Sequence, residues 1–492
     1  MTTQFRKLIC CLVVLAVHIP ASADSSPLII RNVAVVNIEK GKIETDKNVY
    51  VDGDRIHSVT DVGAALPDTP AELRVVDGTG KYLIPGLWDM HTHIASDTIS
   101  RKSVLPVFIA HGVTGIRIML GDCPAPCAQY DAPIETIRQW QTDIAANSQV
   151  GPRLSAASFT VGSAHPDTEK TDPWRPSTPE EARSFVEMEA SRGVDMIKVH
   201  NLVSRPVYFA LAEAAEAHRL DLVGHVPQSV TASEAARAGQ KSIEHLFGVL
   251  EECAGSSTAE RARLRKQMAG DTDTAYQAVK EMARLYDSEQ CHSLFTTFVE
   301  SETWQVPTLV IFNHERAHSW PDNPNNRYIA EPLRTKWKDW QQWELEFFGA
   351  SPDSSWLRTA LARITDEMQA AGVGILAGTD ANWWGIYPGS SLHEELELLT
   401  RAGLSPAEAL RSATLNPAIY FGRADELGTV GAGKYADLVL LDANPLEDIR
   451  NTRKIHSVLF SGRVYGRQKL DQLLSQAERF VANENTGIRA KL

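Results

Sequence analysis

The sequence predicts an α/β protein whose middle part alternates strands with helices and whose two ends are rich in strands. Residues 84–420 alternate short apolar runs with helix-forming stretches, which is typical of βαβ units. Residues 28–82 hold apolar, β-branched runs and no helix of useful length, and strand-like runs return at 433–441 and 458–464. We therefore expect one small β-sandwich composed of residues 24–83 and 421–470, beside a larger domain formed by residues 84–420.

The strands expected in the middle region follow one another at intervals that leave room for helices. The first strand leaves the turn Pro85-Gly86 and ends in His91 and His93. The second to eighth strands are expected at 113–119, 153–157, 194–200, 222–227, 242–246, 304–310 and 373–380. Helical insertions near 254–300 and 324–370 flank the seventh strand.

Composition and the first residues limit the class of protein. The 492 residues carry a formal net charge of −13, which argues against nucleic acid as a partner. Arg6 and Lys7 precede the apolar run 8–19 and the small residues 21–23, so residues 1–23 are predicted to be a signal peptide. The alternative is a buried first helix. We expect a periplasmic or secreted protein without a membrane span, and the sequence leaves its oligomeric state open.

Four cysteines follow the predicted signal peptide. They are Cys123, Cys127, Cys253 and Cys291. None is spaced like a paired Cys-x-x-Cys zinc site, and an oxidising compartment would allow disulfides among them. The sequence alone does not settle which cysteines pair.

His91 and His93 are the first candidate metal ligands. Side chains two residues apart in a strand point to the same face, and imidazole is a common zinc ligand. A bare His-x-His is more often a pair of ordinary polar residues. The full pattern Pro-Gly-Leu-x-Asp-x-His-x-His, from Pro85 to His93, resembles the first metal motif of the amidohydrolase superfamily. The resemblance is to its prolidase and imidazolonepropionase-like branch, and it implies a (β/α)8 TIM-type barrel for residues 84–420.

Four further candidates stand at or near the ends of the later strands. Lys198 lies in the apolar fourth strand, and His225, His245 and Asp380 end the fifth, sixth and eighth strands. The structural alternatives are a lysine whose stem packs while its amine reaches a rim carboxylate, satisfied structural histidines, and an Asp that caps a turn. His200 is a weaker rival of Lys198. The ordered series favours a site, because barrel enzymes place their chemistry where strands end.

The resemblance implies a site with two divalent metal ions of the zinc class. One ion would be held by His91, His93, Asp380 and a carbamate formed from carbon dioxide on Lys198, and the other by His225, His245 and the same carbamate. A hydroxide bridging the metals would attack the substrate, and Asp380 would carry its proton to the leaving nitrogen. The resemblance also suggests that His165 steadies the tetrahedral oxygen.

Trp383 and Trp384 follow Asp380 and are predicted to bind substrate at the rim of the pocket. The alternative is that both rings pack inward against the insertion helices. The expected activity is hydrolysis of the carbon–nitrogen bond of dipeptides, N-acyl amino acids or related small amides. The alternatives are a mononuclear-metal deaminase, a lactonase on the same barrel, and a catalytically inactive binding protein.

Overall fold

The computed structural model describes residues 26–64, 73–127, 131–162, 174–255, 257–268, 272–313, 316, 319–348 and 355–489. The predicted signal peptide, residues 1–23, and His165 lie outside the described residues, so both stay predictions. No described helix combines the length and the apolar character that crossing a membrane requires.

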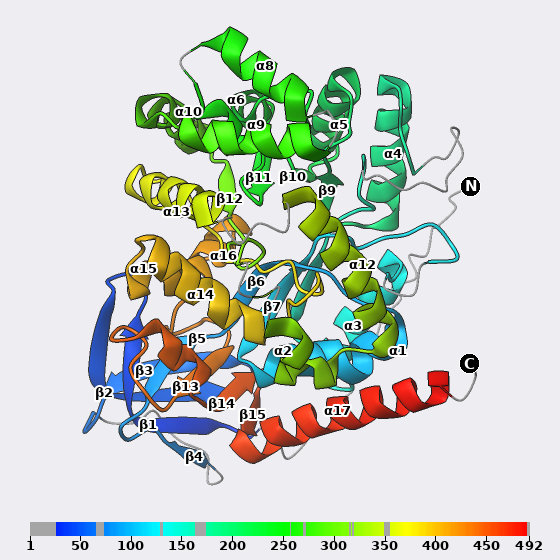
Figure 1. The fold of residues 1–492 in the computed structure, drawn as a ribbon. Helices are drawn as coiled ribbons and strands as arrows, with labels where there is room; N and C mark the ends of the chain where they lie inside the picture. The colour runs from blue at the N-terminus through cyan, green and yellow to red at the C-terminus, as the bar shows by residue number, and fades with distance from the viewer. Residues whose placement is uncertain are drawn as a thin grey trace, which may run out of the picture.

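Seven parallel strands form the centre of the molecule (Figure 1). A three-stranded sheet holds β6 (Leu87–Thr92), β7 (Val113–Ile118) and β8 (Arg153–Ala156) in that order. A four-stranded sheet holds β9 (Met196–Val199), β10 (Asp221–Gly224), β11 (Gln240–Glu244) and β12 (Trp304–Val306). Most of these strand residues are buried, as expected for parallel strands covered on both faces. All seven lie within or overlap the ranges predicted for the first seven strands.

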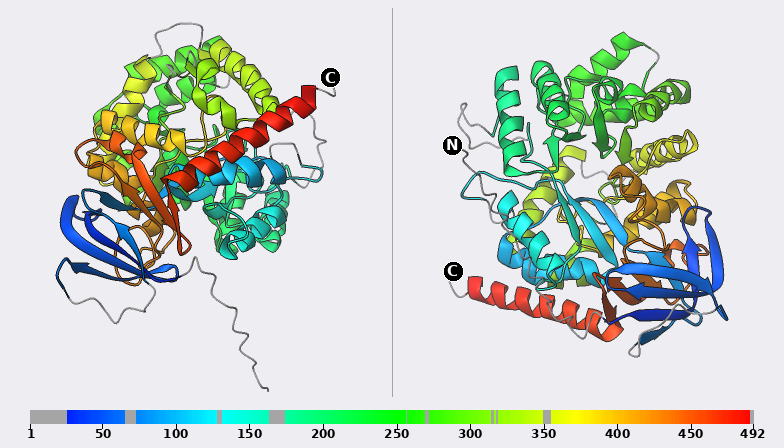
Figure 2. Two further views of the ribbon diagram at one scale, coloured as in Figure 1. Left: turned by 90° about the horizontal axis from the view of Figure 1, so that it is seen from below. Right: turned by 180° about the vertical axis from the view of Figure 1, so that it is seen from behind.

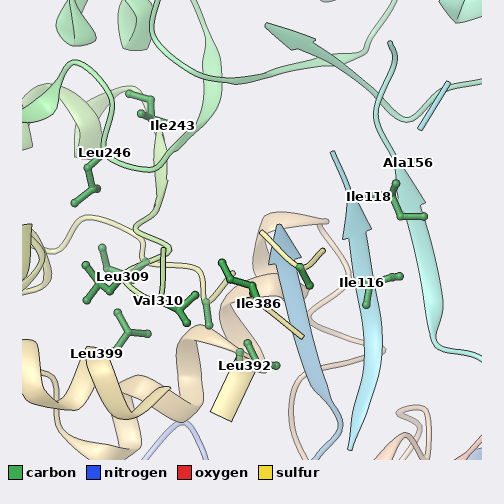
Figure 3. Close-up of a cluster of buried hydrophobic side chains, with 14 of the residues drawn as sticks. Ile116, Ile118, Ala156, Ile243, Leu246, Leu309, Val310, Ile386, Leu392 and Leu399 are labelled. Atoms are coloured by element: carbon green, nitrogen blue, oxygen red, sulfur yellow. The ribbon is translucent and has the colours of Figure 1, made fainter. Parts of the chain in front are cut away.

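Helices connect and cover these strands. They are α2 (Leu105–Ala110), α3 (Ile134–Ala145), α4 (Pro179–Arg192), α5 (Arg205–Ala217), α6 (Ala232–Arg237), α14 (Ser390–Ala402), α15 (Pro406–Ser412) and α16 (Leu415–Tyr420). Capping boxes start α4 at Thr178, α6 at Thr231 and α15 at Ser405, where each side chain accepts a backbone N–H from a Glu three residues on. Figure 3 shows part of the core, with Ile116, Ile118 and Ala156 on strands β7 and β8.

The prediction that the eighth strand is a regular strand is wrong. The described strands also do not close into one continuous barrel sheet. Residues 373–381 take the place of that strand but have only isolated bridges, from Ile375 to Gln305 and from Ala381 to Thr92. Ala377 donates its N–H to Ser412, outside the sheet, and Asp380 has a positive φ of 64°. These two features interrupt the regular ladder. Between β8 and β9, isolated bridges again join the two sheets.

Strands from both ends of the chain share one eight-stranded sheet. Its order is β15-β14-β13-β5-β1-β2-β3, and β4 pairs with β1. The bounds are β1 (Leu28–Asn37), β2 (Lys42–Asp52), β3 (Arg55–Asp61), β4 (Arg74–Asp77), β5 (Tyr82–Pro85), β13 (Leu438–Leu441), β14 (Ile455–Phe460) and β15 (Arg463–Gly466). Because these strands form one sheet, the predicted sandwich of two sheets is not confirmed, and the domain boundaries stay predictions.

Helices occupy both ranges that were predicted to be helical insertions. Between β11 and β12 lie α7 (Val249–Glu252), α8 (Thr258–Met268), α9 (Thr272–Arg284) and α10 (Ser288–Glu300). After β12 come the 3-10 turns η3 (Trp320–Asp322) and η4 (Pro324–Tyr328), then α12 (Glu331–Phe348) and α13 (Ser355–Ala370). Figure 1 shows the first group at the top of the molecule and α12 crossing in front of the strands.

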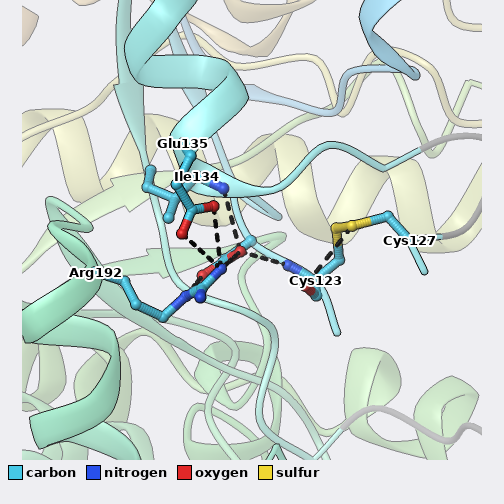
Figure 4. The surroundings of a disulfide bond; sticks show 6 residues. Cys123, Cys127, Ile134, Glu135 and Arg192 are labelled. Carbon is cyan, nitrogen blue, oxygen red and sulfur yellow. Dashed lines mark hydrogen bonds and ion pairs between the residues drawn. A yellow bond between two sulfur atoms is a disulfide. The ribbon is translucent and has the colours of Figure 1, made fainter. Parts of the chain in front are cut away.

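Two disulfides and a C-terminal helix complete the described structure. Cys253 pairs with Cys291, and Cys123 pairs with Cys127 beside the Arg192–Glu135 ion pair (Figure 4). Helix α17 (Arg467–Arg489) was not predicted, and it packs along α2 and the π-helical turn η2 (Ser100–Val104) (Figure 2). The remaining short elements are α1 (Asp97–Ile99) and the 3-10 turn η5 (Ile449–Arg453).

Candidate metal centre

Three of the predicted ligands meet at the end of β6. The Nε2 atoms of His91 and His93 lie 3.2 Å and 2.9 Å from Oδ1 of Asp380. One ligand atom from each of the three residues lies within 4.8 Å of the other two. His91 comes from β6, whereas Asp380 comes from the irregular segment bridged to it. Two imidazoles and one carboxylate at this separation are a suitable donor set for a zinc-class ion.

His225 and His245 stand next to this group. The ring centroid of His245 lies 4.6 Å from that of His91 and 4.9 Å from that of His225. His225 follows β10 and His245 follows β11, so neighbouring parallel strands deliver both rings to the same edge. The structure therefore brings all four predicted histidine ligands together. It also places His200 beside them, with its ring centroid 4.0 Å from that of His225.

Lys198 is buried in β9, one strand away from His225. Its Nζ atom makes no hydrogen bond within the described part of the chain. Burial lowers the pKa of Lys198 to about 8, although Glu244 and Asp380 oppose this shift by favouring the charged form. An amine with a lowered pKa is more often neutral and nucleophilic near physiological pH. These properties fit a lysine that carries a carbamate.

Three of the predicted histidine ligands, His91, His225 and His245, are buried, and each has a partner for its Nδ1 atom. Glu244 Oε2 lies 2.8 Å from Nδ1 of His91, Asn201 Oδ1 lies 2.7 Å from Nδ1 of His225, and Thr308 Oγ1 lies 2.7 Å from Nδ1 of His245. An acceptor at Nδ1 holds the proton there and leaves Nε2 free to bind a metal. These three partners were not predicted. Each of them stands at or just after the end of a strand, either next to a predicted ligand in the sequence or on the neighbouring strand. That position is the sequence feature that could have identified them.

A buried arginine compensates the charge of Glu244. Nη2 of Arg117 donates to Oε1 of Glu244 at 2.8 Å, and both side chains are fully buried. Arg117 also donates to the backbone oxygen of Met90 at 2.6 Å and to the hydroxyl of Tyr420 at 2.9 Å. Burial alone would raise the pKa of Glu244, but Arg117 and His91 outweigh it and hold that pKa well below its usual range. Glu244 is therefore an ionised acceptor for the His91 ring.

A second buried acid, Asp89, supports the turn that contains Asp380. Asp89 accepts the backbone N–H of Thr379 at 3.0 Å and its hydroxyl at 2.6 Å. Burial raises the pKa of Asp89 to about 7, and these hydrogen bonds oppose the shift. Burial would also raise the pKa of Asp380, but His91 and His93 hold it well below its usual range. Asp380 is thus ionised at neutral pH, the form that binds a metal or accepts a proton.

The two tryptophans after Asp380 differ in their surroundings. We expected both at the rim, but Trp384 is only 1% exposed and packs in an aromatic cluster with Trp320 and Trp337. This packing favours the alternative that the Trp384 ring points inward, and a substrate role for Trp384 stays a prediction. Trp383 is partly buried and stacks on Trp340 with ring centroids 4.5 Å apart. A substrate role for Trp383 stays a prediction.

Sequence comparison decides the family. Residues 82–465 match the profile of the Amidohydrolase family, which is most of the chain. The chain belongs to the Amidohydrolase family. This confirms the resemblance to amidohydrolases seen in the sequence.

Curated relatives of this amidohydrolase match it over short segments. An imidazolonepropionase from Shouchella clausii is 33% identical over 105 residues, which cover 20% of this chain and 22% of the relative. An adenine deaminase from Rubrobacter xylanophilus is 30% identical over 155 residues, which cover 27% of this chain and 25% of the relative. The matched segments thus span about a quarter of each relative's length.

Solved structures resemble the amidohydrolase over nearly its whole length. An Xaa-Pro dipeptidase with bound methionine gives a TM-score of 0.64 at 19% identity and covers 90% of this chain and 100% of its own. A bottromycin amidohydrolase gives a TM-score of 0.68 at 22% identity and covers 92% of this chain and 90% of its own. At this level of identity the likeness shows the fold, which is α/β and TIM-barrel-like.

Proposed function

We propose that the protein is a metal-dependent hydrolase that cleaves the amide bond of dipeptides, N-acyl amino acids or related small amides. The observation that carries the proposal is the cluster of His91, His93 and Asp380, with His225 and His245 beside it. The ring centroid of His245 lies 4.6 Å from that of His91 and 4.9 Å from that of His225, so these side chains form one continuous cluster of donors, which the proposal divides between two metal ions. The family match supports the reaction class, and the dipeptidase-like fold supports the substrate class.

The residues present fit two divalent ions bridged by a carbamate on Lys198. Among the predicted ligands, Nζ of Lys198 and Oδ1 of Asp380 are buried without a hydrogen bond within the described chain, and Asp380 Oδ1 lies 3.2 Å and 2.9 Å from the Nε2 atoms of His91 and His93. Unpaired buried polar atoms are uncommon in native structures, and the presence of two of them among the predicted ligands is what a metal site without its ions would give. His91, His93 and Asp380 would hold one ion, His225 and His245 would hold the other, and Lys198 as a carbamate would serve both. When bound, such ions supply Lewis acidity that polarises a carbonyl and activates water.

The chain itself supplies orientation and a proton carrier. Glu244, Asn201 and Thr308 fix the rings of His91, His225 and His245 through Nδ1. Asp380 is ionised, so it accepts a proton when water attacks the amide carbon and returns it to the leaving nitrogen. Loss of that proton to bulk water is limited because Asp380 is 8% exposed.

A mononuclear deaminase is the second candidate. The adenine deaminase relative favours it, and so does the compact three-residue group at His91, His93 and Asp380. The buried amine of Lys198 counts against it, because a single metal ion held by histidines and Asp380 gives that amine no role. For the lactonase and the inactive binding protein, no described contact gives specific support.

A substrate screen separates these candidates. The purified protein, loaded with Zn²⁺ in the presence of bicarbonate, is assayed against dipeptides, N-acyl amino acids, adenine and small lactones. We expect release of an amino acid from an amide substrate. Release of ammonia from adenine without any amide hydrolysis would instead support the deaminase.

A further inference from the structure

Helix α12 of the second insertion reaches the turn that carries Asp380. The indole Nε1 of Trp337, on α12, donates to the backbone oxygen of Asn382 at 2.9 Å. The side-chain Nδ2 of Asn382 in turn donates to the backbone oxygen of His93 at 2.8 Å. One chain of hydrogen bonds therefore runs from the insertion to a predicted metal ligand and passes two residues from Asp380.

This turn needs support from its surroundings. Asp380 has a φ of 64°, a left-handed conformation that is unfavourable for a residue with a side chain. Such a conformation persists only where neighbouring groups hold it. Asp89 holds the preceding Thr379, and the N–H of Trp383 donates to the oxygen of Asp380 at 2.8 Å. Trp337 holds the turn at Asn382, on the other side of Asp380.

Packing fixes the ring of Trp337 in the position that this hydrogen bond requires. Trp337 has no exposed surface, and its ring centroid lies 5.8 Å from that of Trp320 and 5.5 Å from that of Tyr387, both edge-on. Trp340, three residues further along the same helix face, stacks on Trp383. Two neighbouring side chains of α12 thus contact consecutive residues of the turn.

We propose that Trp337 is a positioning residue of the metal centre, whose indole N–H holds the 380–383 turn so that Asp380 faces His91 and His93. This rests on the proposed function, because it assigns a metal to those three residues. It makes helix α12 part of the scaffold of the site.

A matched pair of variants tests the proposal. Trp337→Phe keeps an aromatic ring but removes the N–H that holds Asn382. Trp320→Phe removes the N–H of another buried ring in the same cluster, whose Nε1 has no hydrogen-bond partner among the described residues. Zn²⁺ affinity is measured by competition with a chelator, and the visible spectrum is recorded for Co²⁺-loaded protein. Melting temperatures and the split between kcat and KM are recorded for both variants.

We expect Trp337→Phe to weaken the affinity for one of the two ions by about 10–100-fold, as for other groups that orient metal ligands, and to change the Co²⁺ spectrum. Trp320→Phe keeps an aromatic ring against Trp337, so it should leave the Trp337 hydrogen bond in place and behave like the wild type in both measurements. Equal metal affinity and equal spectra for the two variants would overturn the role of Trp337 and leave the proposed function standing. A wild-type protein that binds no metal would overturn the proposed function itself.

A second measurement covers the case in which Trp337→Phe does not fold. In wild-type protein labelled with 15N at the indole nitrogen, the Trp337 N–H resonance should shift when Zn²⁺ is added, and that of Trp320 should not. The Trp320→Phe variant assigns the control resonance. A Trp337 resonance that does not move on metal loading would overturn the proposal.

Discussion

Glu244 connects the two halves of the candidate metal centre at the level of single residues. It precedes His245 in the chain, yet its carboxylate bonds Nδ1 of His91, 153 residues away. Arg117 pairs with the other carboxylate oxygen in a site that is closed to water. Breaking a buried pair leaves an uncompensated charge, which is far more costly than never having the pair.

We therefore predict that Glu244→Gln destabilises the protein by about 3–5 kcal/mol, because Arg117 loses its counter-charge. Urea unfolding monitored by circular dichroism measures the change. Glu397→Gln is the control, since Glu397 pairs with Arg401 and Arg453 at the surface, and exposed pairs contribute about 0–1 kcal/mol. Equal stabilities of the two variants would contradict the buried pairing.

Asp380→Asn tests the proton carrier. An amide cannot accept or return the proton, so turnover should fall by about 10²–10⁴-fold. The fold should persist, because the backbone contacts of the turn are unchanged, and circular dichroism checks this. Turnover within a factor of a few of the wild type would assign the proton to another group.

At the level of elements, buried polar groups on helices hold the loops that follow the strands. Glu395 on α14 accepts the backbone N–H groups of Leu309 and Val310 at 3.0 Å and 2.8 Å. Those residues directly follow Thr308, which orients His245 and has a positive φ of 47°. The position of the predicted ligand His245 is therefore determined partly by a helix far from it in the sequence.

His393, two residues before Glu395 on the same helix, gives a pH prediction. Its Nε2 donates to the backbone oxygen of His111 at 3.0 Å, and the Thr452 hydroxyl contacts its Nδ1 at 2.9 Å. Burial lowers the pKa of His393 to about 3. The unfolded chain therefore binds a proton below about pH 6.5 that the folded chain does not bind, and stability falls as the pH decreases.

Lowering the pH from 6.5 to 5 should therefore reduce the free energy of unfolding by about 2 kcal/mol through the protonation of His393 in the unfolded chain. In His393→Gln that part of the loss should vanish, so the change in unfolding free energy between pH 7 and pH 5 should be smaller than in the wild type. Urea unfolding at both pH values, with chelator present throughout, measures it. The same change in both proteins would mean that His393 titrates normally.

Several elements were predictable because each depends on local pattern. The histidines and Lys198 stand at or near the ends of short apolar runs, and this ordered series, together with the resemblance to a known family, was enough to single them out. The eighth strand was not predictable in its irregular form, because Ala377 bonds Ser412 and Asp380 takes a left-handed backbone conformation. Glu244, Asn201, Thr308, Asp89 and Trp337 were missed because their roles depend on contacts between distant segments. Whether an aromatic side chain such as Trp384 faces a pocket or a helix also depends on such contacts.

For the whole molecule, two disulfides support the predicted export to an oxidising compartment, which stays a proposal. The Cys253–Cys291 bond joins α7 to α10 across a separation of 38 residues. The Cys123–Cys127 bond spans a separation of four. A bond that closes a longer loop restricts the unfolded chain more strongly.

Replacing Cys253 and Cys291 with Ala should therefore lower the free energy of unfolding by about 4 kcal/mol, against about 2 kcal/mol for the Cys123 and Cys127 pair. Urea unfolding without reductant compares the two double variants. The opposite order would show that the short bond stabilises the folded state through its local contacts instead.

The metal content of the wild-type protein and of Lys198→Ala tests the central claim, a two-metal centre bridged through Lys198, most directly. Protein purified without chelator and supplied with bicarbonate is analysed by elemental mass spectrometry. We predict about two zinc-class ions per wild-type chain, because four histidines, Asp380 and a carbamate on Lys198 would supply enough donors for two ions. Lys198→Ala should lose at least one ion, because it removes the buried amine, unpaired in the described chain, on which the proposed carbamate would form. One ion per chain in both proteins would contradict the account and favour a mononuclear site.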